Sequence, residues 1–213
     1  MLYSIKYVMN AIIFILFIVS TFQALGFDHE LLHSVSNLVC LKQAGYNYAI
    51  FRGYRSYGIF DPVILDNLKN AETAAIKADV YLFPCVKCLN PRAQVDTLVD
   101  GIKNYKYGMI WIDIEIYAWN DNLVTNQQFI LDMIDQVKKR GVSVGVYTSY
   151  HNWEYIVGIN WEGIKEVPLW YAHWDRVMSF DDFKPFGGWT KPVMKQFASD
   201  GIICGTNIDQ DFY

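Results

Sequence analysis

The sequence predicts an α/β fold in which about five βα units and three further strands close into one irregular barrel. Two observations predict this fold. Eight short apolar runs with strand character occur between residue 24 and the C-terminus, and amphipathic stretches separate the first five of them. The alternation of strand and helix is typical of a parallel sheet. Eight strands in one domain of this size favour a closed barrel over an open sheet.

The strand candidates, in chain order, are Ala24–Asp28, Tyr46–Arg52, Val80–Cys85, Met109–Glu115, Val142–Thr148, Pro168–His173, Met194–Ala198 and Asn207–Phe212. The helix candidates between the first five strands are His29–Ala44, Pro62–Lys77, Pro91–Asn104 and Asn126–Gly141. In the last of these, apolar side chains recur at helical spacing from Phe129 to Val137. Irregular segments such as Asp181–Lys191 and Ser199–Thr206 join the last three strands, so the barrel is incomplete in helices.

Residues 1–20 have the pattern of a secretory signal peptide. Lys6 supplies a positive charge, Tyr7–Phe22 is mostly apolar, and positions 18 and 20 fit a cleavage site. Cuts after either residue 24 or residue 26 also fit, so the boundary falls between residues 20 and 26. An uncleaved membrane anchor is the alternative, but the run is short for a membrane span. We therefore expect one domain over residues 21–213, secreted to the extracellular space, a gut lumen or a vacuolar compartment, with no membrane attachment after cleavage.

The charge pattern argues against nucleic acid as a partner. The chain has a formal net charge of −4, and its first 20 residues hold one lysine and no acid, so removing them leaves 17 basic and 22 acidic residues, or −5. The basic run Lys138–Arg140 fits the last turn of a helix, where cations face the negative end of the helix dipole. No basic stripe remains for a nucleic-acid backbone.

Four cysteines fit an oxidising compartment. The spacing of Cys85 and Cys88 allows a redox motif or half of a zinc site, but the sequence offers neither a thioredoxin-like unit nor two further ligands at suitable spacing. Structural disulfides are the favoured interpretation, and we expect no metal and no cofactor. We predict pairs Cys85–Cys88 and Cys40–Cys204, because Cys40 lies in the first helix and Cys204 precedes the last strand, which neighbours the first strand in a closed barrel.

The strand Met109–Glu115 carries the most informative pattern. Side chains alternate in direction along a strand, so the three isoleucines at positions 110, 112 and 114 share the face under the helices. Trp111, Asp113 and Glu115 share the opposite face, which points into a barrel. Both acids lie at the carboxyl end of the strand, where barrel enzymes place their catalytic groups. In a structural role these carboxylates would bind backbone groups or pair with bases, but the strand contains no lysine or arginine, and two acids buried beside each other are costly.

Two neighbouring carboxylates suit glycoside hydrolysis. Each disfavours ionisation of the other, so one acid can keep a proton near neutral pH, and the leaving glycosidic oxygen needs that proton. We assign Glu115, at the strand exit, as the acid/base, and expect Asp113 to stay ionised. Asp28 and Asp209 lie on the first and last strands and should approach the same site, although Asp28 also has the place of a helix cap.

The chain resembles the glycoside hydrolase family 25 lysozymes, the Chalaropsis-type muramidases, and in particular their nematode and invertebrate members. The resemblance runs from Gly26 to Tyr213 and rests on the order and spacing of several short motifs. These motifs are Gly26-Phe27-Asp28, Asp113-Ile114-Glu115, Gly145-Val146-Tyr147-Thr148-Ser149, Pro168-Leu169-Trp170-Tyr171-Ala172, Gln196-Phe197-Ala198-Ser199 and Asn207-Ile208-Asp209.

The resemblance implies an irregular TIM-like barrel that cleaves the β-1,4 bond between N-acetylmuramic acid and N-acetylglucosamine in bacterial peptidoglycan. By position it makes Glu115 the proton donor and Asp113 its acidic companion, with Asp28 and Asp209 as further cleft acids. It also implies retention of configuration with help from the substrate acetamido group, which Asp113 would orient. Residues implied to bind substrate are Tyr147, Trp170 and Gln196. Phe51-Arg52-Gly53-Tyr54 replaces a more usual small-residue stretch, which leaves the role of Arg52 open.

Two alternatives remain beside a secreted, monomeric lysozyme for defence or digestion. A chitinase of the larger barrel family would need a longer ladder of acids, whereas Trp111 and Gly108 stand at those positions. A non-catalytic peptidoglycan-binding, immune-recognition or signalling protein on a lysozyme scaffold would not need both Asp113 and Glu115.

Overall fold

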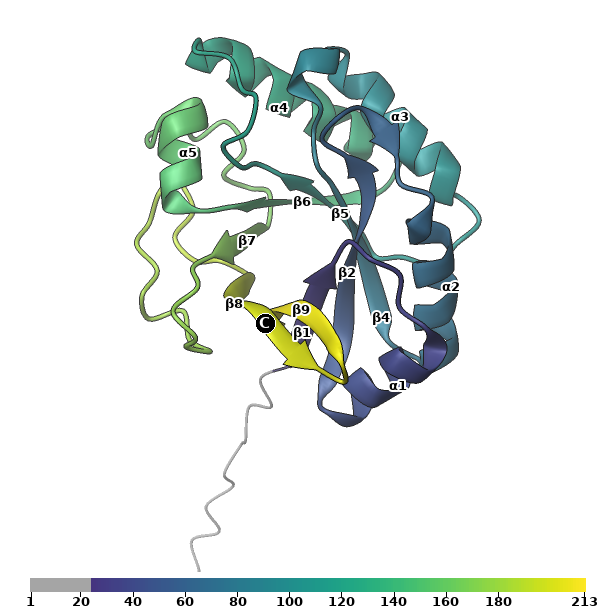
Figure 1. Ribbon diagram of the computed structural model, residues 1–213. Coiled ribbons are helices and arrows are strands. Elements are labelled where there is room, and N and C mark those ends of the chain that lie inside the picture. Colours follow the sequence, from purple (N-terminus) through teal and green to yellow (C-terminus); the bar gives the residue numbers. More distant parts are fainter. Residues whose placement is uncertain (1–23) are drawn as a thin grey trace, which may run out of the picture.

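The computed structural model describes residues 24–213, so the predicted signal peptide lies outside the described residues (Figure 1). The strands are β1 (Leu25–His29), β2 (Tyr46–Arg55), β3 (Ile59–Phe60), β4 (Lys77–Leu82), β5 (Met109–Asp113), β6 (Ser143–Thr148), β7 (Leu169–Ala172), β8 (Met194–Ile203) and β9 (Thr206–Phe212). The helices are α1 (Val35–Gln43), α2 (Val63–Ala74), α3 (Pro91–Ile102), α4 (Leu123–Lys139) and α5 (Tyr150–Val157), and a 3-10 turn, η1, spans Val86–Cys88.

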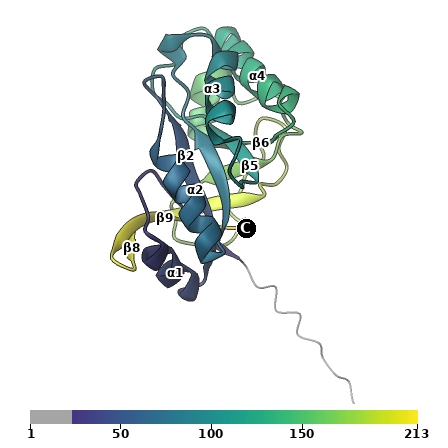
Figure 2. The same ribbon diagram turned by 90° about the vertical axis from the view of Figure 1, so that its right-hand side faces the viewer.

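Within the described residues, all of these strands except β3 close into the predicted barrel. Neighbouring strands pair in parallel from β1 through β2, β4, β5, β6 and β7 to β8, and β9 closes the ring by pairing antiparallel with both β8 and β1. Five βα units therefore precede three strands without intervening helices, as predicted. Figure 1 shows the helices outside the ring of strands, and Figure 2 shows the same arrangement from the side.

Alternation along β5 divides its side chains between two layers, as expected. Ile110, Ile112 and Ile114 are buried in the large core between the strands and the helices. Trp111 belongs instead to a smaller cluster inside the barrel, together with Ile50, Tyr147, Trp170 and Met194. These side chains fill the barrel interior below its mouth, so polar groups above them stand on a packed floor.

Several boundaries differ from the sequence prediction. β5 ends at Asp113, so Glu115 lies just beyond it. β4 runs from Lys77 to Leu82, so it starts and ends earlier than predicted, and its buried Asp79 carboxylate accepts hydrogen bonds from the Met109 amide and the Trp111 indole. The segment 199–206 is not an irregular connection, because most of it belongs to β8 and β9, which form a long hairpin.

Helix α5 had no sequence candidate of its own. Ser149 caps its amino end by accepting a hydrogen bond from the Asn152 amide. Trp153 is fully buried and packs against Trp161 and Trp189. The aromatic cluster, rather than a long amphipathic repeat, therefore holds this short helix on the barrel.

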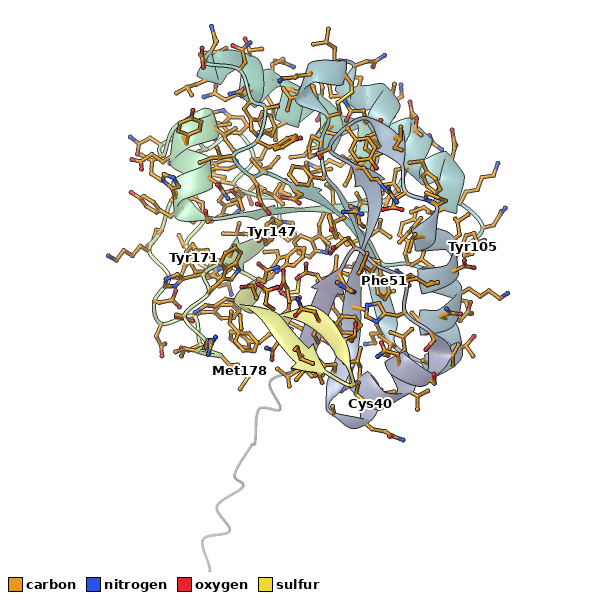
Figure 3. The ribbon with its side chains drawn as sticks, in the orientation of Figure 1. Cys40, Phe51, Tyr105, Tyr147, Tyr171 and Met178 are labelled. Carbon is orange, nitrogen blue, oxygen red and sulfur yellow. A yellow bond between two sulfur atoms is a disulfide. The ribbon has the colours of Figure 1, made fainter. Side chains whose placement is uncertain are left out.

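Both predicted disulfides are present. Cys85 pairs with Cys88, and Cys40 of α1 pairs with Cys204 at the tip of the β8–β9 hairpin (Figure 3). Figure 2 shows α1 and this hairpin on the same side of the molecule. The long-range bridge therefore ties the first helix to the strands that close the barrel. Among residues 24–213, no helix combines the length and the apolar character that crossing a membrane requires.

Candidate active site

A cleft of ≈ 280 Å³ opens at the carboxyl ends of the parallel strands. Its walls contain all seven residues that the sequence predicted for the site: Asp28, Asp113, Glu115, Tyr147, Trp170, Gln196 and Asp209. A larger hollow of ≈ 460 Å³ lies at the amino ends of β4 and β5, around Asp79 and Gly108. The predicted acids converge only in the smaller cleft, so we place the candidate active site there.

Asp113 is the deepest of the paired acids. It ends β5 beside Tyr147 of β6 and is only 5% exposed. Its Oδ1 atom has no hydrogen-bond partner within residues 24–213. Burial raises the pKa of Asp113 well above its ordinary value, and the charge of Glu115 and a hydrogen bond to that carboxylate raise it further. Burial therefore disfavours the ionised form of Asp113.

Glu115 lies above Asp113, nearer the solvent. Pairing between β5 and β6 continues past Asp113, because the Ile114 amide donates to the Tyr147 carbonyl (2.8 Å). The Trp119 indole then donates to the Glu115 carbonyl (2.6 Å) and fixes the turn. Burial and the Asp209 charge raise the pKa of Glu115, whereas hydrogen bonds from Asp113 and Tyr147 oppose this rise.

The structure adds the relative depth of the two acids to the sequence expectation that Asp113 stays ionised, which remains a prediction. Alternation along a strand shows that two side chains share a face, but it does not show which of them lies deeper. Asp113 is buried and Glu115 is half-buried, so desolvation opposes ionisation more strongly at Asp113. The two groups titrate as a coupled pair rather than as independent acids.

Gln196 connects three walls of the cleft. Its Oε1 atom accepts hydrogen bonds from the Tyr147 hydroxyl (2.7 Å) and the Trp174 indole (2.6 Å). Its Nε2 atom donates to Asp28 Oδ1 (2.6 Å). Burial raises the pKa of Asp28 well above its ordinary value, the charge of Asp209 adds to this, and the Gln196 hydrogen bond opposes it. The network fixes the orientation of Tyr147 and Asp28 toward the cleft.

Asp28 and Asp209 meet as predicted. They are directly paired residues of the antiparallel strands β1 and β9. The alternative role of Asp28 as a helix cap does not apply, because α1 begins later and Ser34 caps it. Burial raises the pKa of Asp209, although the Asp200 amide donates a hydrogen bond to its carboxylate.

Sequence reasoning missed Asp211, which lies one layer below these acids. Asp211 is fully buried, accepts a hydrogen bond from the Trp170 indole (2.8 Å), and has a second oxygen without a partner in the described chain. Burial raises its pKa well above the ordinary value, and the Asp28 charge adds to this. The two-residue spacing from Asp209, which repeats that of Asp113 and Glu115, was the signal that could have revealed it.

The cleft also contains Arg52, whose role the sequence left open, and four residues that no sequence motif indicated: Glu30, Tyr81, Phe83 and Trp174. Strand alternation from the inward-facing Asp79 could have placed Tyr81 in the cleft. The ring of Trp174 is 59% exposed and lies in the loop after β7, so periodicity could not predict its position.

One cluster outside the cleft has the spacing of metal ligands: His173, Asp175 and Asp182. The fully buried Lys195 ammonium donates to Asp175 (2.9 Å) and Asp182 (2.7 Å). A protein cation therefore already balances these carboxylates and anchors the loop between β7 and β8. The cleft residues themselves offer the oxygen atoms of acids but no histidine or cysteine.

A barrel with a carboxylate pair at the end of one strand, one member of which holds a proton, has the features of a glycoside hydrolase. Comparisons with known proteins agree with this class. The family described as "Lysozyme-like protein 1" matches residues 20–197. "Probable GH family 25 lysozyme 4" of Dictyostelium discoideum is 40% identical over 191 residues, which cover 88% of this chain and 89% of that protein.

"Lysozyme-like protein 5" of Caenorhabditis elegans is 36% identical over 193 residues, which cover 88% of this chain and 90% of that protein. The solved structure of a muramidase from Trichobolus zukalii shares the fold, with a TM-score of 0.72 and 21% identity over 89% of this chain and 93% of that chain. The chain belongs to the GH family 25 lysozymes, which confirms the resemblance seen in the sequence.

Proposed function

We propose that this glycoside hydrolase cleaves the β-1,4 bond between N-acetylmuramic acid and N-acetylglucosamine in bacterial peptidoglycan. The observation that carries the proposal is the coupled pair Asp113 and Glu115, which holds a proton at the carboxyl end of β5 inside an open cleft. The matched relatives named as GH family 25 lysozymes support the same reaction.

In the proposed reaction, the pair supplies one proton. Substrate binding brings an acetamido N–H to Asp113. Asp113 passes its own proton across the hydrogen bond to Glu115, and the resulting Asp113 carboxylate accepts a hydrogen bond from the acetamido N–H. Glu115 then protonates the leaving glycosidic oxygen as the bond from C1 to that oxygen breaks. The acetamido oxygen attacks C1, and Glu115 next removes a proton from the water that opens this intermediate, so configuration is retained.

The other cleft residues hold the sugar in this arrangement. Asp28 and Asp209 place carboxyl oxygens beside the ring that becomes positively charged, and Gln196 holds Asp28 in place. Tyr147 and Trp170, with ring centroids 4.5 Å apart, form part of the packed floor beneath the substrate.

The test is incubation of purified protein with defined peptidoglycan, followed by borohydride reduction and mass analysis of the fragments. Reduced muramic acid at the new chain ends is the expected product, and reduced glucosamine would contradict the proposed bond. Glu115→Gln serves as the inactive control. Binding to the cell wall without release of fragments by the wild-type protein would instead support a recognition or signalling protein.

We further propose that the protein is secreted and acts as a monomer in defence or digestion. The predicted signal peptide and the two disulfides support export to an oxidising compartment. Expression of this chain in an animal cell line should place the processed protein in the medium, with its first residue between positions 21 and 27. Retention of the unprocessed chain in cell membranes would contradict the proposal.

A further inference from the structure

Arg52 is the one lysine or arginine among the residues that line the described cleft. It lies near the carboxyl end of β2. Strand β1 pairs with β2 on one side, and on the other side Arg52 pairs with Tyr81 of β4. Ile50, two residues earlier, faces the barrel interior, so alternation directs Arg52 to the same face at the mouth. A permanent positive charge therefore stands in a cleft that otherwise contains five acids.

The guanidinium group is held from behind by a buried carboxylate. Arg52 Nε donates to Asp61 Oδ2 (2.9 Å), and Asp61 is fully buried. The other Asp61 oxygen accepts from Arg55 (2.7 Å) and from the Val63 amide (3.3 Å). One carboxylate thus balances two guanidinium groups, which leaves one excess positive charge at this end of β2.

The two terminal nitrogens of Arg52 donate no hydrogen bond within residues 24–213. Arg52 is also not among the main influences on the pKa values of Asp28, Asp113 and Glu115, which are burial, other carboxylates and hydrogen bonds. The Nε contact with Asp61 fixes the plane of the group, so its free edge is oriented in advance of binding.

We infer that Arg52 determines specificity by binding a carboxylate carried by the substrate. This inference rests on the proposed function and adds a residue that selects the substrate. The free edge of a guanidinium group matches a carboxylate with two parallel hydrogen bonds. A chain of N-acetylglucosamine alone carries no charge, whereas the muramic acid ring carries a lactyl group at O3. The shared ligand chemistry is a carboxylate on this substituent, either the free lactyl group or an acid of the peptide attached to it.

The experiment compares strands that differ only in these carboxylates. The first pair consists of peptide-free glycan strands with free lactyl carboxylates and the same strands as methyl esters. The second pair consists of peptide-bearing strands with free and with amidated peptide carboxylates. For each pair, kcat/KM is measured for the wild-type protein, Arg52→Gln, Arg52→Lys and Arg55→Gln.

The wild-type protein should prefer the charged member of one pair by about ten- to a hundredfold, the range for hydrogen bonds to charged groups. Preference in the first pair identifies the lactyl carboxylate, and preference in the second identifies the peptide. Arg52→Gln should abolish the preference, and Arg52→Lys should keep part of it. Arg55→Gln is the matched control, because it also removes a guanidinium group from Asp61 but does not line the cleft, and it should keep the wild-type preference.

A wild-type protein without preference in either pair would overturn the inference, as would an Arg52→Gln protein that keeps the preference. Arg55 still balances Asp61 in the Arg52 variants, so their melting temperatures should stay close to that of Arg55→Gln. Absence of cleavage of every strand by the wild-type protein is a different result, because it would overturn the proposed function and this inference with it.

Discussion

Removal of the disulfide between Cys40 and Cys204 should destabilise the barrel far more than removal of the disulfide between Cys85 and Cys88. The first bridge joins residues 164 positions apart and the second joins residues three positions apart. A chain-entropy estimate for the unfolded state gives roughly 5 kcal/mol for the long loop and roughly 2 kcal/mol for the short one. For a domain of this size, the first loss corresponds to a melting temperature lower by about 10–20 °C.

The variants are Cys40→Ser with Cys204→Ser, and Cys85→Ala with Cys88→Ala as the comparison. Cys40 is exposed, so its replacement by serine removes little buried surface, and Cys85 is buried, so alanine avoids a buried hydroxyl. Urea unfolding followed by circular dichroism gives the free energy of unfolding of each variant. If the long-range variant loses no more stability than the short-range variant, barrel closure does not depend on this bridge and the reasoning is wrong.

Three further predictions concern the cleft acids. Glu115→Gln should lower kcat by about 10²- to 10⁴-fold with an unchanged melting temperature, and Asp113→Asn should lower it more than Asp28→Asn does, as measured on soluble glycan fragments. The kcat/KM profile should be bell-shaped with its maximum below about pH 7, because the reaction needs one acid protonated and another ionised. The raised pKa values of Asp113 and Glu115 retain the needed proton in acid, and the rate falls at higher pH once that proton leaves; a flat profile would contradict this. Asp211 has a raised pKa when folded, so the folded state binds its proton more tightly and stability falls as the pH rises from the ordinary value through the raised one. Asp211→Asn should therefore stabilise the protein at about pH 8 and change little at about pH 3, as denaturant unfolding at both values will show.

Local patterns predicted the barrel and the paired acids, because both depend on periodicity along single strands. The alternation of Trp111, Asp113 and Glu115 with isoleucines was sufficient to place three side chains inside and three outside. Barrel closure then brought Asp28 of the first strand beside Asp209 of the last. These relations require only the direction of each side chain and the order of the strands.

The features that sequence reasoning missed depend on contacts between distant segments. The exposure of Arg52 at the mouth depends on Asp61, which lies beyond a turn and a short strand that periodicity did not indicate. The place of Trp174 depends on its hydrogen bond with Gln196, 22 residues later. Loops take their conformation from such contacts, so no local repeat in the sequence encodes them.

The motif Gly26-Phe27-Asp28 shows how the antiparallel last strand determines the acidity of the cleft. Because β9 runs opposite to β1, Asp209 lies at the mouth opposite Asp28, and Asp211 lies one layer deeper opposite Gly26. A Cβ atom at Gly26 would lie 3.4 Å from Asp211 Cβ, so the missing side chain leaves room for a buried carboxyl group at this level. Phe27, between the two, turns outward into the main core. Had β9 run parallel, Asp211 would lie nearer the mouth than Asp209 and would be solvated. The raised pKa of Asp211, and part of the rise at Asp28, therefore follow from strand direction as much as from the residues themselves.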